Sequence, residues 1–285
     1  MQKPGGKYSA EETGRRARLG KRQVRFLYRP QKRERMEQFG NIILYNADCM
    51  EIMKTFPDKG FDLAIVDPPY GINVTKMSMG SGIGPFGDRN AKKLRNKRLS
   101  GSGKLKDRIL NRMGCDWDIA PDGEYFDELF RVSKNQIIWG GNYFNLRPTR
   151  CFVIWDKEQS FLNFSACEYA WTSFDYPSKL YRFANRGFQS KDKSQKIHPT
   201  QKPVQLYKFL INNFGNPGDL ILDTHLGSGS ICIAAHDLGF DLTGIEIDKE
   251  YYNEAKKRLL NHQRQLKIFD ANDIVMNKEL ELFEL

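Results

Sequence analysis

The segment Asp67-Pro68-Pro69-Tyr70 carries groups that could act on the exocyclic amine of a nucleic-acid base. Such an amine is conjugated with its ring and is a poor nucleophile. The Asp67 carboxylate and the Pro68 carbonyl could accept hydrogen bonds from its N–H groups, which would free its lone pair for in-line attack on a sulfonium methyl. Two prolines remove competing N–H donors, and Tyr70 offers a ring face to an extruded base. A proline turn capped by Asp67 is the alternative, but the position directly after an apolar run favours the catalytic interpretation.

A second candidate site is a glycine-containing loop after the apolar run 220–222. It contains Asp223, Leu226, Gly227, Ser228 and Gly229. Glycines let a backbone approach a ligand closely, and the helix expected to follow favours a carboxylate or phosphate at its N-terminus. The loop is weak evidence by itself. It lacks the G-x-G-x-x-G pattern of dinucleotide-binding proteins, which argues against a dehydrogenase.

Glu246 stands at the end of a further expected strand, 241–245, and Glu246 and Ile247 are assigned to the same ligand site. A carboxylate at the end of such a strand suits the two hydroxyls of a ribose. Acids at strand ends often cap the next helix, but Asp248 is better placed to do so. Glu246 is therefore expected to be available to a ligand.

Apolar strands that alternate with helices must position these residues. The pattern predicts an α/β domain with a mostly parallel sheet and helices on both faces. Pro203 is expected at the first position of its helix. The expected strands are 42–45, 61–66, 136–139, 151–155, 166–172, 219–222 and 241–246, and the expected helices are 49–55, 122–132, one after 203, 231–238 and 249–260.

The formal charge of +10 is concentrated in two segments of the 285-residue chain. Residues 1–36 carry +9 and residues 71–116 carry +8, which leaves −7 for the rest. A basic segment can simply aid solubility, but two of them, one directly after Tyr70, favour a polyanionic partner. We expect 1–36 to be a flexible tail, 73–114 a mobile insertion and 175–197 a short target-recognition segment.

Other protein classes are disfavoured by composition. No apolar run approaches the roughly 20 residues that span a bilayer, and the basic N-terminus lacks the apolar core of a secretory signal. The five cysteines are scattered without Cys-x-x-Cys pairs, which argues against disulfides and a structural metal site. A cytoplasmic protein without bound metal is expected.

Taken together, these motifs resemble the permuted β-type amino-methyltransferases of DNA, the N-4/N-6 DNA methylase family, including small stand-alone enzymes of bacteriophages. The resemblance covers residues 41–263. Three further segments match family motifs in order along the chain: Asn46-Ala47-Asp48-Cys49, Trp155-Asp156-Lys157 and His198-Pro199-Thr200-Gln201-Lys202-Pro203. Thr224 and His225 depart from the family's Asp-Pro-Phe at the start of the glycine loop, which puts the packing around the cofactor's methionine in doubt.

The resemblance implies roles for individual residues. Asp48 would contact the adenine amine of S-adenosylmethionine, with Cys49 beside it. His198, Thr200 and Lys202 would bind near the methionine end of the cofactor, and Trp155 would join Tyr70 in binding the substrate base.

The implied enzyme transfers a methyl group from S-adenosylmethionine to the N6 amine of a flipped adenine in double-stranded DNA. The implied fold is Rossmann-like, with a seven-stranded, mostly parallel sheet and a circularly permuted motif order. The catalytic domain would span 37–263, followed by an extension at 264–285. Both a monomer and a homodimer are compatible with the sequence.

Three alternatives stay open. Cytosine-N4 methylases of this family carry Ser where Asp67 stands, so Asp67 favours adenine. Relatives that methylate RNA or protein glutamine usually show Asn-Pro-Pro-Tyr. A catalytically silent DNA-binding decoy is disfavoured because the chemical residues are intact. The insertion 73–114 and the segment 175–197 are the candidate recognition elements, and neither indicates the DNA sequence that is recognised.

Overall fold

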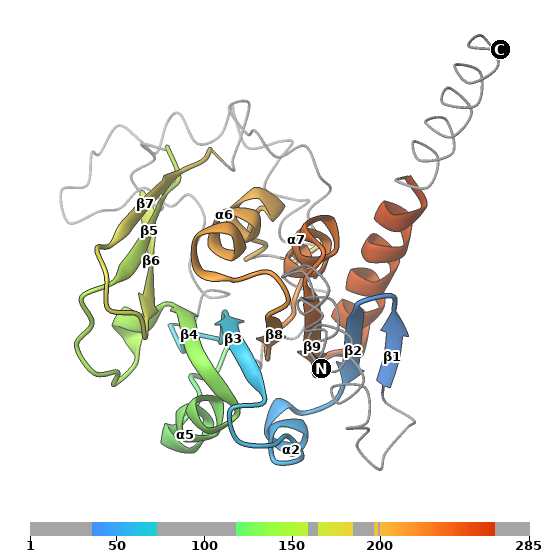
Figure 1. Cartoon of the computed structure of the whole chain (residues 1–285), viewed down its shortest axis with the longest axis horizontal. Helices are drawn as coiled ribbons and strands as arrows, with labels where there is room; N and C mark the ends of the chain where they lie inside the picture. The colour runs from blue at the N-terminus through green and yellow to red at the C-terminus, as the bar shows by residue number, and fades with distance from the viewer. Residues whose placement is uncertain (1–35, 73–117, 159–164, 185–196, 199, 266–285) are drawn as a thin grey trace, which may run out of the picture.

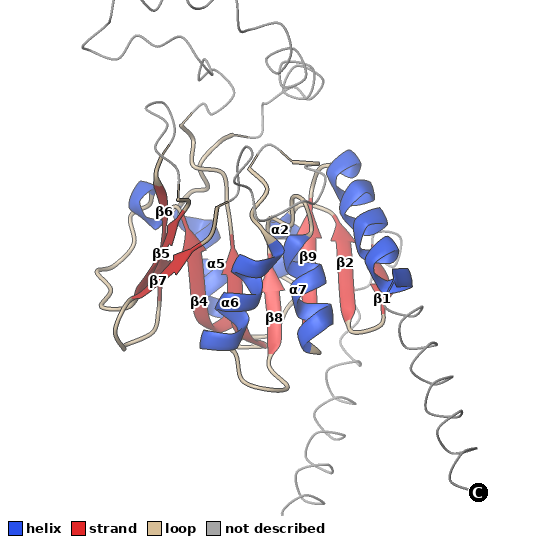
Figure 2. Ribbon diagram, turned by 90° about the horizontal axis from the view of Figure 1, so that it is seen from above, coloured by secondary structure: helices blue, strands red, loops and turns tan. Residues whose placement is uncertain are grey.

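The computed structural model describes residues 36–72, 118–158, 165–184, 197–198 and 200–265. Within these residues nine strands form one sheet in the order β1-β2-β9-β8-β3-β4-β6-β5-β7 (Figure 2). The strands are β1 (Met36–Phe39), β2 (Ile42–Asn46), β3 (Phe61–Val66), β4 (Ser133–Trp139), β5 (Phe152–Asp156), β6 (Cys167–Thr172), β7 (Lys179–Arg182), β8 (Leu220–Asp223) and β9 (Asp241–Glu246). The helices are α2 (Cys49–Met53), α5 (Gly123–Val132), α6 (Val204–Phe214), α7 (Ser230–Leu238), a 3-10 turn η2 (Gly141–Tyr143) and residues 249–265.

Five of the eight strand pairings are parallel, and they include the central run from β2 through β4. β3 and β8 are parallel neighbours at its centre. From β3 the chain passes through α5 to β4 on one side, whereas from β8 it passes through α7 to β9 on the other. The winding direction therefore reverses between β3 and β8, and ligands of such sheets bind outside the carboxyl ends of the strands at this point.

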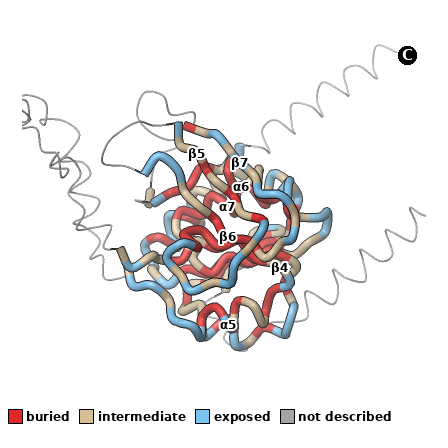
Figure 3. Tube along the Cα trace, turned by 90° about the vertical axis from the view of Figure 1, so that its left-hand side faces the viewer, coloured by how far each residue is buried: buried red, intermediate tan, exposed pale blue. Residues whose placement is uncertain are grey.

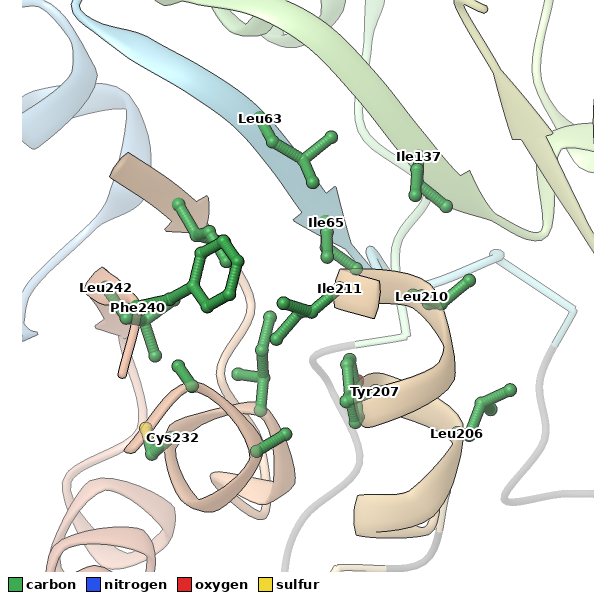
Figure 4. Close-up of a cluster of buried hydrophobic side chains, with 14 of the residues drawn as sticks. Leu63, Ile65, Ile137, Leu206, Tyr207, Leu210, Ile211, Cys232, Phe240 and Leu242 are labelled. Carbon is green, nitrogen blue, oxygen red and sulfur yellow. The ribbon is translucent and has the colours of Figure 1, made fainter. Parts of the chain in front are cut away.

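Helices cover both faces of the sheet, as Figure 1 shows: α6 and α7 lie on one face, α2 and α5 on the other. Successive side chains of a strand point to opposite faces. Leu63 and Ile65 of β3 accordingly join the core under α6 and α7, while Ala64 and Val66 join the core under α5. Figure 4 shows Leu63 and Ile65 facing the α6 residue Ile211.

The buried residues run along the sheet between the two helical layers (Figure 3). β3 is buried at five of its six positions, which explains why its sequence is almost continuously apolar. Burying one Leu or Ile side chain stabilises a fold by about 1.5–3 kcal/mol. Packing on both faces therefore fixes the end of β3, from which the Asp67 segment leaves.

The structure corrects the sequence predictions at two places. The sheet is mostly parallel, as expected, but it has nine strands rather than seven. Its antiparallel pairs are β1–β2, β4–β6 and β5–β6. The two additional strands, β1 and β7, are four-residue edge strands with little buried surface; β7 lies inside the segment 175–197 that was expected to recognise the target. Pro203 is the N-cap of α6, with extended backbone, rather than its first helical residue.

Several predictions concern residues outside the described part of the chain. These are the tail up to residue 35, the insertion 73–114, residues 185–196 of the expected recognition segment and the extension from 266. Among the described residues no helix has the length and apolar character needed to cross a membrane.

Candidate active site

Asp67 and Tyr70 lie at the carboxyl end of β3, where the strand stops and the two prolines follow. The Tyr70 hydroxyl donates a hydrogen bond to Asp67 Oδ1 over 2.7 Å. Burial, together with the Asp67 charge, raises the pKa of the Tyr70 hydroxyl well above its ordinary value. Tyr70 therefore stays protonated at neutral pH and acts as a donor that fixes one oxygen of the carboxylate.

The ring of Tyr70 is held by the turn that follows β4. Tyr143 stacks on it with ring centroids 5.0 Å apart, and Phe144 meets it edge-on at 6.2 Å. Gly140 has a φ of +68°, and a Cβ there would lie 2.2 Å from the nearest ring atom of Tyr70. Sequence reasoning missed these contacts. The pair Gly140-Gly141 after a strand was the one signal of a close backbone approach.

A buried lysine meets Asp67 from the other side. The Lys202 ammonium contacts Asp67 Oδ2 and lies 3.2 Å from Glu168 Oε2, and only 3% of the Lys202 side chain is exposed. Lys157 completes the group with a 2.6 Å ion pair to Glu168 Oε1. Burial alone would lower the pKa of Lys202, but Asp67 and Glu168 outweigh it and raise that pKa.

The glycine loop follows β8 at the same edge of the sheet. Gly227 and Gly229 adopt φ angles of +52° and +66°, a region that side chains rarely occupy. The N–H of Gly227 donates to Glu246 Oε2 over 2.7 Å, and the N–H of Asp248 donates to Oε1 over 2.9 Å. Burial raises the pKa of Glu246 although these N–H groups oppose the shift.

Glu246 was expected to be available to a ligand because Asp248 would cap the next helix, and only the second part of this expectation is met. Asp248 does cap the following helix, because its Oδ1 accepts from the N–H groups of Glu250 and Tyr251 at 2.8 and 3.0 Å. Glu246 also accepts two backbone bonds, so it is not free. A carboxylate has about four acceptor sites, which leaves room for two ligand hydroxyls.

The residues that depart from the family pattern are integrated into the site. Thr224 Oγ1 lies 2.7 Å from the Tyr125 hydroxyl and 2.9 Å from His225 Nδ1. The backbone N–H of His225 donates to Asp223 Oδ1 over 3.0 Å. Burial raises the pKa of Asp223 to about 8 and lowers that of His225 to about 4, so both side chains are mainly neutral at pH 7.

A family model described as DNA methylase matches residues 61–257, more than half of the chain. The chain belongs to this DNA methylase family. The type II methyltransferase M.HinfI of Haemophilus influenzae is 26% identical over 264 residues, which cover 80% of this chain and 70% of that protein. M.HpaI of Haemophilus parainfluenzae is 26% identical over 243 residues, with 75% and 72% covered. The solved M1.HpyAVI–SAM complex aligns with a TM-score of 0.45 and 19% identity over 76% of this chain and 98% of that chain.

Further residues of the expected cofactor site also lie around the ends of this DNA methylase's central strands. Asp48 follows β2, beside the end of β9, and its Oδ1 accepts from Met50 N over 2.7 Å as the cap of α2. Cys49 begins that helix, and burial raises the pKa of its thiol to about 12. Ile247 is 65% exposed next to Glu246 and offers an apolar surface there.

The His-Pro-Thr-Gln-Lys-Pro segment divides between the two halves of the site. The His198 ring packs on Tyr251 at 4.3 Å and would lie 3.8 Å from a Cβ at Gly227. Its Nδ1 lies 3.0 Å from the Thr200 hydroxyl. Both residues are therefore on the glycine-loop side, whereas Lys202 lies against Asp67.

Two of the expected site residues are almost fully buried. Leu226 is 4% exposed, and its N–H donates to the backbone of Ile245 over 3.0 Å. Ser228 is 6% exposed, and its hydroxyl lies 3.1 Å from that of Ser230. These two residues shape the loop through its backbone.

Trp155 requires a correction. It is 3% exposed, lies in the hydrophobic core with Trp139, and donates from Nε1 to the Phe183 carbonyl over 3.0 Å. Its ring has no face for a substrate base. Lys157, two residues later in the same motif, forms the ion pair with Glu168.

Proposed function

We propose that this DNA methylase transfers a methyl group from S-adenosylmethionine to the N6 amine of an adenine that is rotated out of double-stranded DNA. The observation that carries the proposal is the position of Asp67 and Tyr70. They lie at the end of β3, beside the glycine loop at the end of β8, where the sheet reverses direction. A target amine at Asp67 and a cofactor at the loop would share one edge of the sheet.

The residues of that edge fit S-adenosylmethionine. Glu246 supplies a buried carboxylate held by two backbone donors, which suits the two hydroxyls of a ribose. Ile247 supplies exposed apolar surface beside it, which suits the face of an adenine ring. Gly227 has no side chain to occupy the space between the loop backbone and the His198 ring. When bound there, the cofactor would supply an electrophilic methyl group on a sulfonium sulfur. The sulfur is the leaving group and keeps the bonding electron pair as a neutral thioether.

Asp67 and Pro68 orient the target amine. The carboxylate and the carbonyl each accept a hydrogen bond from one of its two N–H groups, and the lone pair then points along the line of attack. One N–C bond forms, one C–S bond breaks, and the nitrogen loses one proton to solvent after the transfer. Tyr70 keeps Asp67 in place through its 2.7 Å hydrogen bond and provides an aromatic surface beside the base.

The choice of adenine rests on Asp67, because Ser is usual at this position in the family's cytosine-N4 enzymes. A cytosine-N4 methylase and a silent DNA-binding protein are the alternatives. Sequencing that detects modified bases in DNA from cells expressing the chain separates all three. N6-methyladenine at a defined motif supports the proposal. N4-methylcytosine would show that the target base is cytosine rather than adenine. Unmodified DNA would overturn the proposed enzymatic activity.

A further inference from the structure

Four charged side chains meet beside Tyr70, and the proposed methyl transfer uses only one of them. Lys202 bridges the carboxylates of Asp67 and Glu168, and Lys157 pairs with the second oxygen of Glu168. The formal charges of this network sum to zero. Lys202 also lies 5.1 Å from the centre of the Trp139 ring and donates to the Tyr70 hydroxyl over 3.5 Å, so its charged partners are the two carboxylates.

Stability alone gives a poor account of this network. Glu168 Oε2 is buried, and its charged partner is the Lys202 ammonium 3.2 Å away. Buried ion pairs are often replaceable by apolar side chains without loss of stability. The arrangement therefore points to a role in the site.

Asp67 must accept the target amine, yet both of its oxygens already have partners. Oδ1 accepts from the Tyr70 hydroxyl, and Oδ2 contacts the Lys202 ammonium. Each carboxylate oxygen can accept a second bond, but an incoming N–H group at Oδ2 has to share that oxygen with the Lys202 ammonium and its charge. If Asp67 were the sole partner of Lys202, moving the ammonium away from Oδ2 would leave a buried charge unpaired, which is strongly destabilising.

We propose that Glu168 is a positioning residue, which shares the Lys202 ammonium with Asp67 and receives it when the target amine binds Asp67. The proposal rests on the methyl-transfer function above. Glu168 comes from β6, and Lys202 comes from the segment before α6. A short displacement of the ammonium toward Glu168 would free Asp67 Oδ2 while both charges stay paired. Lys157 keeps the other oxygen of Glu168 neutralised throughout.

The protonation states allow this exchange without proton transfer. Burial would raise the pKa of Glu168, but Lys202 and Lys157 outweigh it and lower that pKa to about 2. The pKa of Lys202 is raised in turn, since the two carboxylates outweigh its burial. Both groups are charged at neutral pH, so the ammonium is shared between two ionised carboxylates.

The test compares three chains in single-turnover methylation of DNA: wild type, Glu168→Gln, and the double variant Glu168→Gln with Lys157→Met. Glu168→Gln keeps the shape of the side chain and removes the second carboxylate. The rate of methyl transfer should fall by about tenfold or more, while the KM for DNA and the calorimetric affinity for S-adenosylmethionine should change by less than about twofold.

The double variant separates positioning from charge balance. It restores the net charge of zero, so a network needed only for stability would recover both its melting temperature and its rate. The proposal expects the melting temperature to recover and the rate to stay low, because Lys202 still lacks a second carboxylate. Wild-type rates in either variant overturn the positioning role and leave the methylase function intact. A wild-type chain that methylates no base overturns both.

Discussion

Gly140→Ala tests whether the position of Tyr70 controls catalysis. Gly140 adopts a φ of +68°, and a Cβ there would lie 2.2, 2.5 and 2.6 Å from three atoms of the Tyr70 ring. Three such similar distances place the new atom over the face of the ring rather than beyond its edge. The ring must therefore move away from the turn, against the stacking of Tyr143 and the hydrogen bond to Asp67.

Two effects add up in this variant. A non-glycine residue in the left-handed region destabilises by about 1–2 kcal/mol. Carbon atoms in contact normally lie about 3.5–4.0 Å apart, so the ring has to shift by more than an ångström. A misplacement of about 1 Å in a catalytic arrangement lowers rates by roughly a hundredfold. We therefore expect Gly140→Ala to slow methylation by about that factor.

Gly239→Ala is the matched control. Gly239 has a φ of +71° at the end of α7, and a Cβ there would meet no atom within 4 Å. It carries the backbone strain without the collision. In urea titrations Gly239→Ala should lose unfolding free energy through backbone strain alone and Gly140→Ala at least as much, but only Gly140→Ala should lose methylation. Near-wild-type turnover in Gly140→Ala would refute the reasoning that the Tyr70 ring must stay where the turn holds it.

Three further predictions concern the cofactor, pH and DNA. Glu246→Gln should weaken S-adenosylmethionine binding by about tenfold or more in calorimetry, because one ribose hydroxyl loses a charged acceptor; equal affinities would remove Glu246 from the site. The pKa of Asp223 rises from 3.8 to about 8 on folding, so its stabilising contribution is full below pH 3.8 and is lost as the pH rises toward 8; the unfolding free energy of the wild type should therefore fall relative to that of Asp223→Asn, whose side chain does not titrate, and a constant difference would contradict it. The logarithm of the DNA-binding constant should fall linearly with the logarithm of the salt concentration, with a slope of about −0.9 per phosphate contacted. Deleting residues 1–36 should make this slope shallower; superimposable titrations would assign those charges to solubility.

The central half of the fold could be predicted because its residues carry strong local patterns. The runs that became β3 and β8 are apolar at all but one position, which is typical of central parallel strands covered on both faces; β9 is buried at five of its six positions although half of its residues are polar. Acidic residues placed directly after or at the ends of these strands could be assigned to one edge from topology alone. Asp67, Asp223 and Glu246 do lie there.

The remaining features depend on contacts that no local pattern records. β1 and β7 are four-residue edge strands without a fully buried residue, and half of their residues are polar, so they resemble loops in sequence. Lys202 was assigned to the cofactor by its motif, but its ammonium lies against Asp67, 135 positions earlier in the chain. Glu168 gave no signal because its importance depends on which side chains the sheet brings beside it.

Nucleoside analysis by mass spectrometry tests the central claim most directly. DNA is incubated with S-adenosylmethionine and either the wild-type chain or Asp67→Ala, and the cofactor affinity of both is measured alongside. We expect N6-methyldeoxyadenosine from the wild type and none from Asp67→Ala, with nearly equal cofactor affinities, because the bonds of Asp67 matter mainly as the target nitrogen changes geometry. Methylation by Asp67→Ala at the wild-type rate, or N4-methyldeoxycytidine as the wild-type product, would contradict this account.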